Sequence, residues 1–175
     1  VPIFPIELCA VNFKRLDELN RRTSNILASL LLARIRFYQN RSVIKRHQKI
    51  WIAKSREEIA AWFGLGLRKV DALLSLLVQK GLIEKSISTF LGKKKLFLRA
   101  VDESIDMPVN FSLLETLLSF TGDLESALCL SKIAFSNNQS HILHKGLAWA
   151  SQSRKEFSSF LKVSIRKVDY LLEGL

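Results

Sequence analysis

The chain has 175 residues, 48% of them hydrophobic, which is enough for one ordinary domain or two small ones and excludes an intrinsically disordered chain. Lys and Arg total 27 against 16 Asp and Glu, a formal net charge of +11 with a pI near 10.0. A folded chain this basic favours a polyanionic partner, most often nucleic acid, over a membrane surface.

The first predicted elements are a helix, a basic connection and a short strand. Apolar residues recur at helical spacing over residues 25–40, and Thr23 or Ser24 is suited to cap the N-terminus of that helix. Residues 41–49 are expected to form a basic connection, and the apolar run 50–53 a first strand.

A capping box opens the second predicted helix. The Ser55 hydroxyl is expected to accept a hydrogen bond from the Glu58 amide, while the Glu58 carboxylate reaches back to the Ser55 amide. Gly64 ends this helix because a tight turn there requires a positive φ. The chain from Ser55 to Gly64 therefore predicts a short helix followed by a tight turn.

A third helix and a hairpin complete the first predicted unit. The helix is expected over 67–80, with an apolar stripe formed by Val70, Leu73, Leu74, Leu77 and Val78. A strand over 82–90, a basic turn over 91–95 and a returning strand over 96–101 follow. The order is helix, strand, helix, turn, helix, strand, basic turn, strand.

The chain also repeats itself at an offset of 98 residues. Between Thr23 and Leu77, about 19 of 55 positions are identical without a gap, among them the Ser-Arg pair at 55 and the Arg-Lys-Val-Asp run at 68. An offset of this size indicates a duplicated domain. The expected fold class is α+β, mainly α with small β wings, with domains at 1–101 and 111–175 joined by a linker at 102–110.

The second copy is expected to follow the first, with two departures. Helices are predicted over 111–120, 123–136 and 165–175, and 147–150 is predicted to be a strand. Lys162 stands where the first copy has the turn glycine, and Ser158 replaces Ala60. Either this turn has another shape, or the second copy serves packing more than ligand binding.

Ala60, Gly64 and Val70 stand at the alanine, glycine and valine spacing of the helix-turn-helix family, and the first copy resembles a winged helix with its basic turn as the wing. Two such copies resemble the tandem winged-helix replication initiators of bacterial plasmids and phages. The resemblance implies sequence-specific binding of double-stranded DNA. Further partners would be a second copy of the chain or the replication or transcription machinery. A transcription regulator and a tandem winged-helix interaction scaffold are the alternatives.

The resemblance assigns DNA contacts to the third helix and the wing. Arg68 would read a guanine edge and Lys69 would bind a phosphate, with Ser75 on the same outward side. Further candidates are Lys93, Lys94 and Lys95 on the wing, the cluster Lys45, Arg46 and Lys49, and, in the second copy, Ser164, Arg166 and Lys167. For each basic cluster the alternative is an ordinary solvated surface.

The aspartates at 71 and 169 recur together with the arginines at 56 and 154. An acidic side chain on a DNA-facing helix would repel phosphate. Each aspartate is therefore expected to pair with the arginine of the preceding helix and to fix the angle between the two helices.

No catalytic, cofactor or metal motif emerges from the sequence. The Gly-Leu-Gly run at 64 lacks the third glycine of a dinucleotide loop, and His141-x-x-His144 has no further ligands nearby. The expectation is a protein that is not an enzyme and needs no cofactor.

The cysteines and the ends of the chain bear on its location. Cys9 and Cys129 lie in apolar segments and suggest thiols of a reducing compartment, although a disulfide stays open. No apolar run approaches the ~18 residues of a membrane span, and the start lacks a signal peptide's charged region. The expected location is the bacterial cytoplasm, on nucleoid or plasmid. The sequence does not begin with Met, and it ends inside a helical pattern before any second wing. Both features suggest a fragment.

Overall fold

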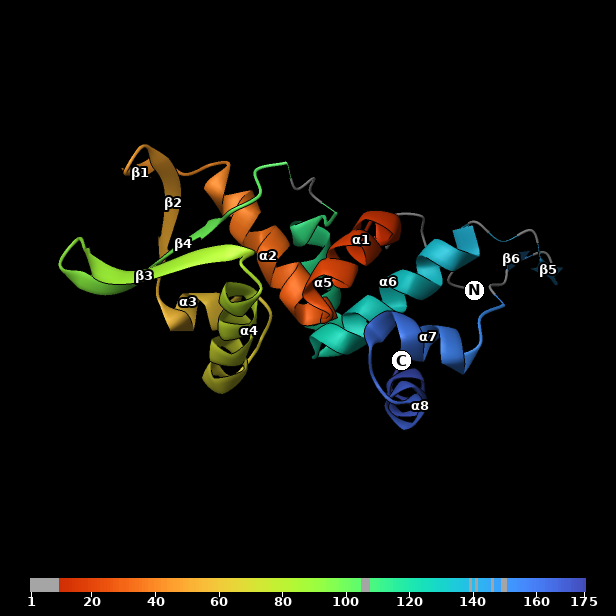
Figure 1. Cartoon of the computed structure of the whole chain (residues 1–175). Helices are drawn as coiled ribbons and strands as arrows, with labels where there is room; N and C mark the ends of the chain where they lie inside the picture. The colour runs from red at the N-terminus through yellow and green to blue at the C-terminus, as the bar shows by residue number, and fades with distance from the viewer. Residues whose placement is uncertain (1–9, 105–107, 139, 141, 146, 149–150) are drawn as a thin grey trace. The chain divides into compact units, whose positions relative to one another are not determined.

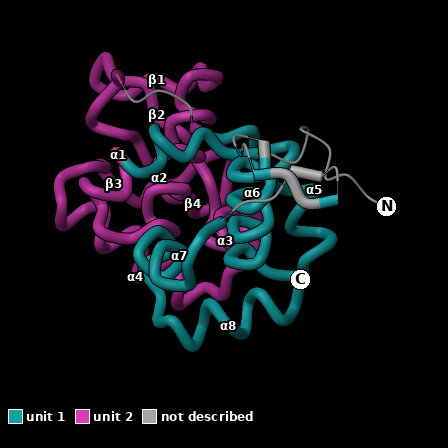
Figure 2. Tube along the Cα trace, turned by 90° about the vertical axis from the view of Figure 1, so that its right-hand side faces the viewer, with its two compact units in different colours: residues 1–17, 109–175 teal, residues 18–108 magenta. Residues whose placement is uncertain are grey.

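The computed structural model describes residues 10–175 except 105–107, 139, 141, 146 and 149–150, and these residues form a mostly helical α+β structure (Figure 1). They belong to two compact units, shown in Figure 2: unit 1 comprises 1–17 and 109–175, and unit 2 comprises 18–108. The second boundary lies inside the expected linker at 102–110. Residues 10–17, expected in the first domain, instead belong with 109–175.

Unit 2 contains a four-stranded antiparallel sheet in the order β1-β2-β4-β3. Its strands are β1 (Ile44–Arg46), β2 (Lys49–Lys54), β3 (Ile83–Phe90) and β4 (Lys93–Ala100). Its helices are α2 (Ile26–Gln39), α3 (Arg56–Ala61) and α4 (Leu67–Gln79), preceded by α1 (Phe13–Thr23), which crosses the boundary between the units.

The core of unit 2 lies between α2, α4 and the inward face of β4. Helix α2 is buried along most of its length, and it contacts both α4 and β4. The predicted stripe on α4 is confirmed, because Val70, Leu73, Leu74 and Leu77 are all buried. Val78, expected in the same stripe, is 40% exposed because it lies at the edge of that face. The buried stripe holds one side of α4 in the core and leaves its other side outward.

Two connections differ from their prediction. Asn25, rather than Thr23 or Ser24, caps α2, because α1 runs to Thr23 and the Asn25 side chain accepts from the Ala28 amide at 3.0 Å. The expected connection over 41–49 instead contains β1, which pairs antiparallel with β2. Both residues of the turn, His47 and Gln48, have positive φ, the backbone typical of two-residue hairpin turns.

The third difference concerns the basic turn predicted over 91–95. The turn consists of Leu91 and Gly92 alone, both with positive φ, and the three lysines that follow lie in β4. Alternation along a strand then sends Lys94 to one face of the hairpin and its two neighbours to the other. The three lysines therefore do not all lie on one face of the hairpin.

Unit 1 contains a second series of helices that matches the first. Its elements are α5 (Phe111–Thr121), α6 (Leu124–Asn138), β5 (Leu143–His144), β6 (Leu147–Ala148), α7 (Arg154–Leu161) and α8 (Ile165–Glu173). The four helices α5 to α8 begin 98 residues after α1 to α4, in the same order. Of the strand predicted over 147–150, Trp149 and Ala150 lie outside the described residues.

Equivalent polar residues also begin equivalent helices. The side chains of Asn12 and Asn110 each accept a backbone N–H three residues on, at 3.2 Å, at the starts of α1 and α5. The capping box predicted at Ser55 and its repeat at Ser153 are both present and begin α3 and α7. The repeat therefore extends upstream of Thr23, to a helix that the apolar pattern alone did not predict.

The turns after α3 and α7 share one backbone shape. Gly64 has φ of 63°, and the equivalent Lys162 has φ of 55° and ψ of 39°, both left-handed. The Leu65 amide donates to the Ala60 carbonyl at 3.0 Å, and the equivalent bond in unit 1 measures 3.3 Å. The open question about the second turn is answered: its shape is the same, with a lysine in a conformation that favours glycine.

Exchanging residue types at this turn should shift stability in opposite directions. Lys162→Gly is expected to raise the free energy of unfolding by up to about 1 kcal/mol, and Gly64→Lys to lower it by about as much. No atom lies within 4 Å of a Cβ built on Gly64, so its cost is backbone strain alone. Thermal unfolding of both variants measures the effect, and a destabilising Lys162→Gly would contradict it.

Candidate nucleic-acid interface

Helix α4 presents a continuous outward face opposite its buried stripe. Arg68, Ala72 and Ser75 are exposed on this face at i, i+4 and i+7, and Lys69 is exposed beside them. The face is therefore basic in its first turn and carries small side chains in the following turns. Small side chains allow a second surface to approach the helix closely.

The structure confirms the two predicted Arg–Asp pairs. Arg56 at the start of α3 donates to Asp71 on α4 at 3.1 Å, and Arg154 pairs with Asp169 at 2.9 Å between α7 and α8. Because these pairs are largely exposed, each adds little stability on its own. The same contact between the two helices therefore recurs in both units.

The β3–β4 hairpin carries further cations. Lys93 and Lys94 are exposed near its turn, and Lys85 is exposed on β3. Lys85 and Thr89 are four residues apart on β3, so their side chains lie on the same face of the hairpin. Thr89 is paired with Lys94 across the two strands, so Lys94 shares that face with Lys85. Lys85 was not among the predicted site residues; strand alternation across the hairpin would have found it.

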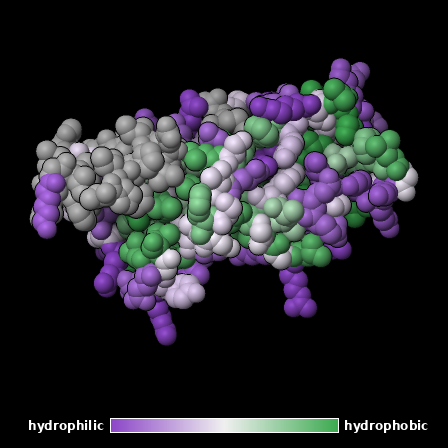
Figure 3. All heavy atoms as spheres, turned by 180° about the vertical axis from the view of Figure 1, so that it is seen from behind, coloured by the Kyte–Doolittle hydropathy of each residue, from purple (hydrophilic) through white to green (hydrophobic). Residues whose placement is uncertain are grey.

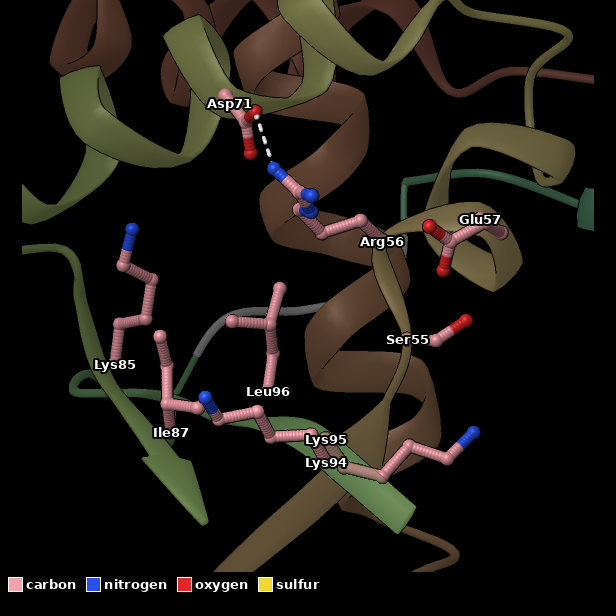
Figure 4. Close-up of a pocket in the computed structure, with 9 residues that line it drawn as sticks. All are labelled: Ser55, Arg56, Glu57, Asp71, Lys85, Ile87, Lys94, Lys95 and Leu96. Atoms are coloured by element: carbon pink, nitrogen blue, oxygen red, sulfur yellow. Dashed lines mark hydrogen bonds and ion pairs between the residues drawn. The ribbon is translucent and has the colours of Figure 1, made fainter. Parts of the chain in front are cut away.

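A hollow of about 540 Å³ lies between this hairpin and the helices (Figure 4). Residues of β3 and β4 line one side of it, and the Arg56–Asp71 pair spans the other. Lys85, Lys94 and Lys95 contribute cations to its wall, whereas Glu57 and Asp71 contribute carboxylates. The hollow therefore joins α4 and the hairpin in one mainly cationic surface.

Lys95 differs from the other two lysines of the predicted wing in having a carboxylate partner. Its Nζ forms an ion pair with the Glu58 carboxylate, to which Lys54 also donates at 3.3 Å. Burial opposes ionisation of Glu58, but hydrogen bonds from Lys95, the Ser55 amide and Lys54 outweigh it and lower the Glu58 pKa to about 2. Lys95 thus has a partner inside unit 2.

Glu58 should make unit 2 sensitive to acid. Because its folded pKa lies below the ordinary value of 4.5, its contribution is complete above pH 4.5 and is lost as the pH falls towards 2. Glu58→Gln is expected to reduce the loss of stability over that range. Chemical unfolding at several pH values measures it, and a variant as acid-sensitive as the wild type would contradict the assignment.

Two of the three cations predicted on the β1–β2 hairpin contact other side chains of unit 2. Arg46 lies over the Phe97 ring, 4.4 Å from its centre, and donates to the Ser86 hydroxyl at 3.2 Å. Lys49 pairs with Glu84 at 3.0 Å. Lys45, by contrast, is exposed on β1.

Of the three residues predicted as DNA contacts in unit 1, Ser164 and Lys167 are placed differently from their counterparts at α4. The Ser164 side chain caps the helix by accepting from the Lys167 amide at 3.2 Å, where α4 has Gly66 without a side-chain cap. The Lys167 ammonium pairs with Glu125 at 3.2 Å and lies 5.1 Å from the centre of the Tyr170 ring. Arg166 is exposed.

Positive charge is concentrated in unit 2. Residues 18–108 contain 18 Lys and Arg against 8 Asp and Glu, a net charge of +10, whereas unit 1 contains 9 against 8, a net charge of +1. Within the described part of the chain, six exposed cations of unit 2 form no ion pair, side-chain hydrogen bond or ring contact: Lys45, Arg68, Lys69, Lys85, Lys93 and Lys94. Figure 3 shows hydrophilic side chains beside hydrophobic ones over the hairpin end of unit 2.

Among the described residues, no group of three or more His, Cys, Asp or Glu is placed to hold a metal ion, and none of their helices is long and apolar enough to cross a bilayer. His141 lies outside the described residues. Comparison of the chain with family models, curated protein sequences and solved structures found no match.

Proposed function

We propose that unit 2 is a winged-helix module that binds duplex DNA. The observation that carries the proposal is the set of six exposed, unpaired cations on α4 and the two hairpins. They surround the outward face of α4, whose other side chains, Ala72 and Ser75, are small. The major groove, about 12 Å wide, admits an α-helix, and phosphates are bound by Lys and Arg side chains beside it.

Within this arrangement, α4 enters the major groove with its first turn leading. Arg68 is exposed and unpaired in that turn, so its guanidinium is free to bond a guanine edge. Ser75 lies one turn further on. Lys93, Lys94 and Lys85 approach the flanking backbone from the β3–β4 hairpin, and Lys45 from β1. Lys95, Arg46 and Lys49 have partners within unit 2 instead.

For the biological role, we infer a replication initiator of the plasmid or phage type, with a transcription regulator as the alternative. The inference is supported by the two series of helices, which have the same order and spacing within one chain. In this arrangement the chain resembles tandem winged-helix initiators. Selection of bound sequences from a random pool of duplex DNA tests it. Enrichment of directly repeated sites is expected; a palindrome would favour the regulator. A pool without any enriched sequence would contradict sequence-specific binding.

A further inference from the structure

The outward face of α8 differs in chemistry from the equivalent face of α4. Arg166, Tyr170 and Glu173 are exposed at i, i+4 and i+7, where α4 has an arginine, an alanine and a serine. Tyr170 is 68% exposed. An aromatic ring and a carboxylate therefore stand where α4 has small neutral side chains.

This face is poorly suited to DNA. Glu173 would lie against phosphates and repel them. Lys167, which in α4 corresponds to a free cation, is held by Glu125 and the Tyr170 ring. Unit 1 as a whole has a net charge of only +1. Tyrosine and arginine are enriched at protein interfaces.

We propose that this face binds the same face of a second copy of the chain, with the two α8 helices antiparallel. A two-fold axis near Tyr170 then brings Arg166 of each copy opposite Glu173 of the other, so both contacts form at once. Among the described residues, neither side chain has an ion pair within its own chain. The pattern from Arg166 to Glu173 is thus complementary to itself only in the antiparallel orientation.

A hollow beside Tyr170 adds to this complementarity. It measures about 350 Å³, and the carboxylates in its wall belong to Asp123 and Glu173. The Arg166 guanidinium of the second copy would find both carboxylates there. The near-neutral charge of unit 1 lets two copies meet without the repulsion that two copies of unit 2 would experience.

Charge exchange on the full chain tests the pairing. Arg166→Glu and Glu173→Arg each place like charges opposite one another in the dimer, and sedimentation equilibrium is expected to show dimerisation weakened by at least about tenfold for each. The double variant restores opposite charges and should dimerise like the wild type. A mixture of the two single variants should form a heterodimer, because one supplies both acids and the other both bases.

Folding is not expected to limit these variants. Arg166→Glu places an acid in the first turn of α8 and Glu173→Arg a base in the last, and both agree with the helix dipole. Circular dichroism verifies this. The matched control Arg68→Glu on α4 should weaken DNA binding and leave the oligomeric state unchanged, so the two proposals fail separately.

Three results would overturn the proposal. One is a wild-type chain that stays monomeric at its highest soluble concentration. Another is a dimer that the single variants leave intact or that the double variant does not restore. The third is a DNA footprint that shrinks by one helical turn when Arg166 and Lys167 become Ala at unchanged oligomeric state, because α8 would then bind the groove.

Discussion

The affinity of the chain for duplex DNA is expected to fall by about three orders of magnitude between about 50 and about 200 mM salt, because each neutralised phosphate releases a counterion. Six exposed, unpaired cations on unit 2 set this size. Fluorescence anisotropy with a labelled duplex over a salt series measures the slope of log K against log salt. A flat response would remove the DNA proposal.

Matched lysines sharpen this test. Lys94→Ala removes a free cation and should lower the salt slope by about one unit. Lys49→Ala removes a cation already paired with Glu84, and should change the slope far less. Equal changes for both variants would show that the internal pair does not persist when DNA is bound.

The second large effect is expected from Arg68. Arg68→Ala should weaken binding to the selected site by about 1–3 kcal/mol and relax the preference at one base pair, because a bidentate contact to guanine is lost. Lys69→Ala should weaken all sequences alike, since phosphate carries no base identity. Competition between selected and random duplexes separates these two effects.

Arg166→Ala serves as the matched control for Arg68→Ala. It changes the equivalent position of α8, where the neighbouring Tyr170 and Glu173 make groove binding unfavourable. Under conditions where the chain is monomeric, it should leave DNA affinity almost unchanged. Equal losses from Arg68→Ala on selected and random DNA would refute base recognition by Arg68, and equal losses from both variants would restore the earlier expectation of two DNA-reading units.

The sequence by itself determined the features that depend on near neighbours. Both capping boxes, the left-handed turn at Gly64 and the apolar stripe of α4 follow from residue types at fixed short spacings, and the structure confirms them. The Arg–Asp pairs also followed, because two recurring positions on adjacent helices carried opposite charge. The repeat also extends to α1, because the run Val-Asn-Phe occurs at 11 and again at 109, 98 residues later.

Only the tertiary structure decided which cations remain free. Lys93, Lys94 and Lys95 are alike in sequence, but Lys95 pairs with Glu58, 37 residues away, and Lys49 pairs with Glu84, 35 residues away. Glu58 lies on α3 and Glu84 on β3, so these pairs depend on which elements pack together in the fold, and a local pattern of charges does not reveal that. The inclusion of residues before 18 in unit 1 likewise rests on contacts with distant residues, such as the bridge between Val11 and Val109. Local chemistry determines where an element begins and ends, whereas the partner of each side chain depends on segments that meet only in the folded chain.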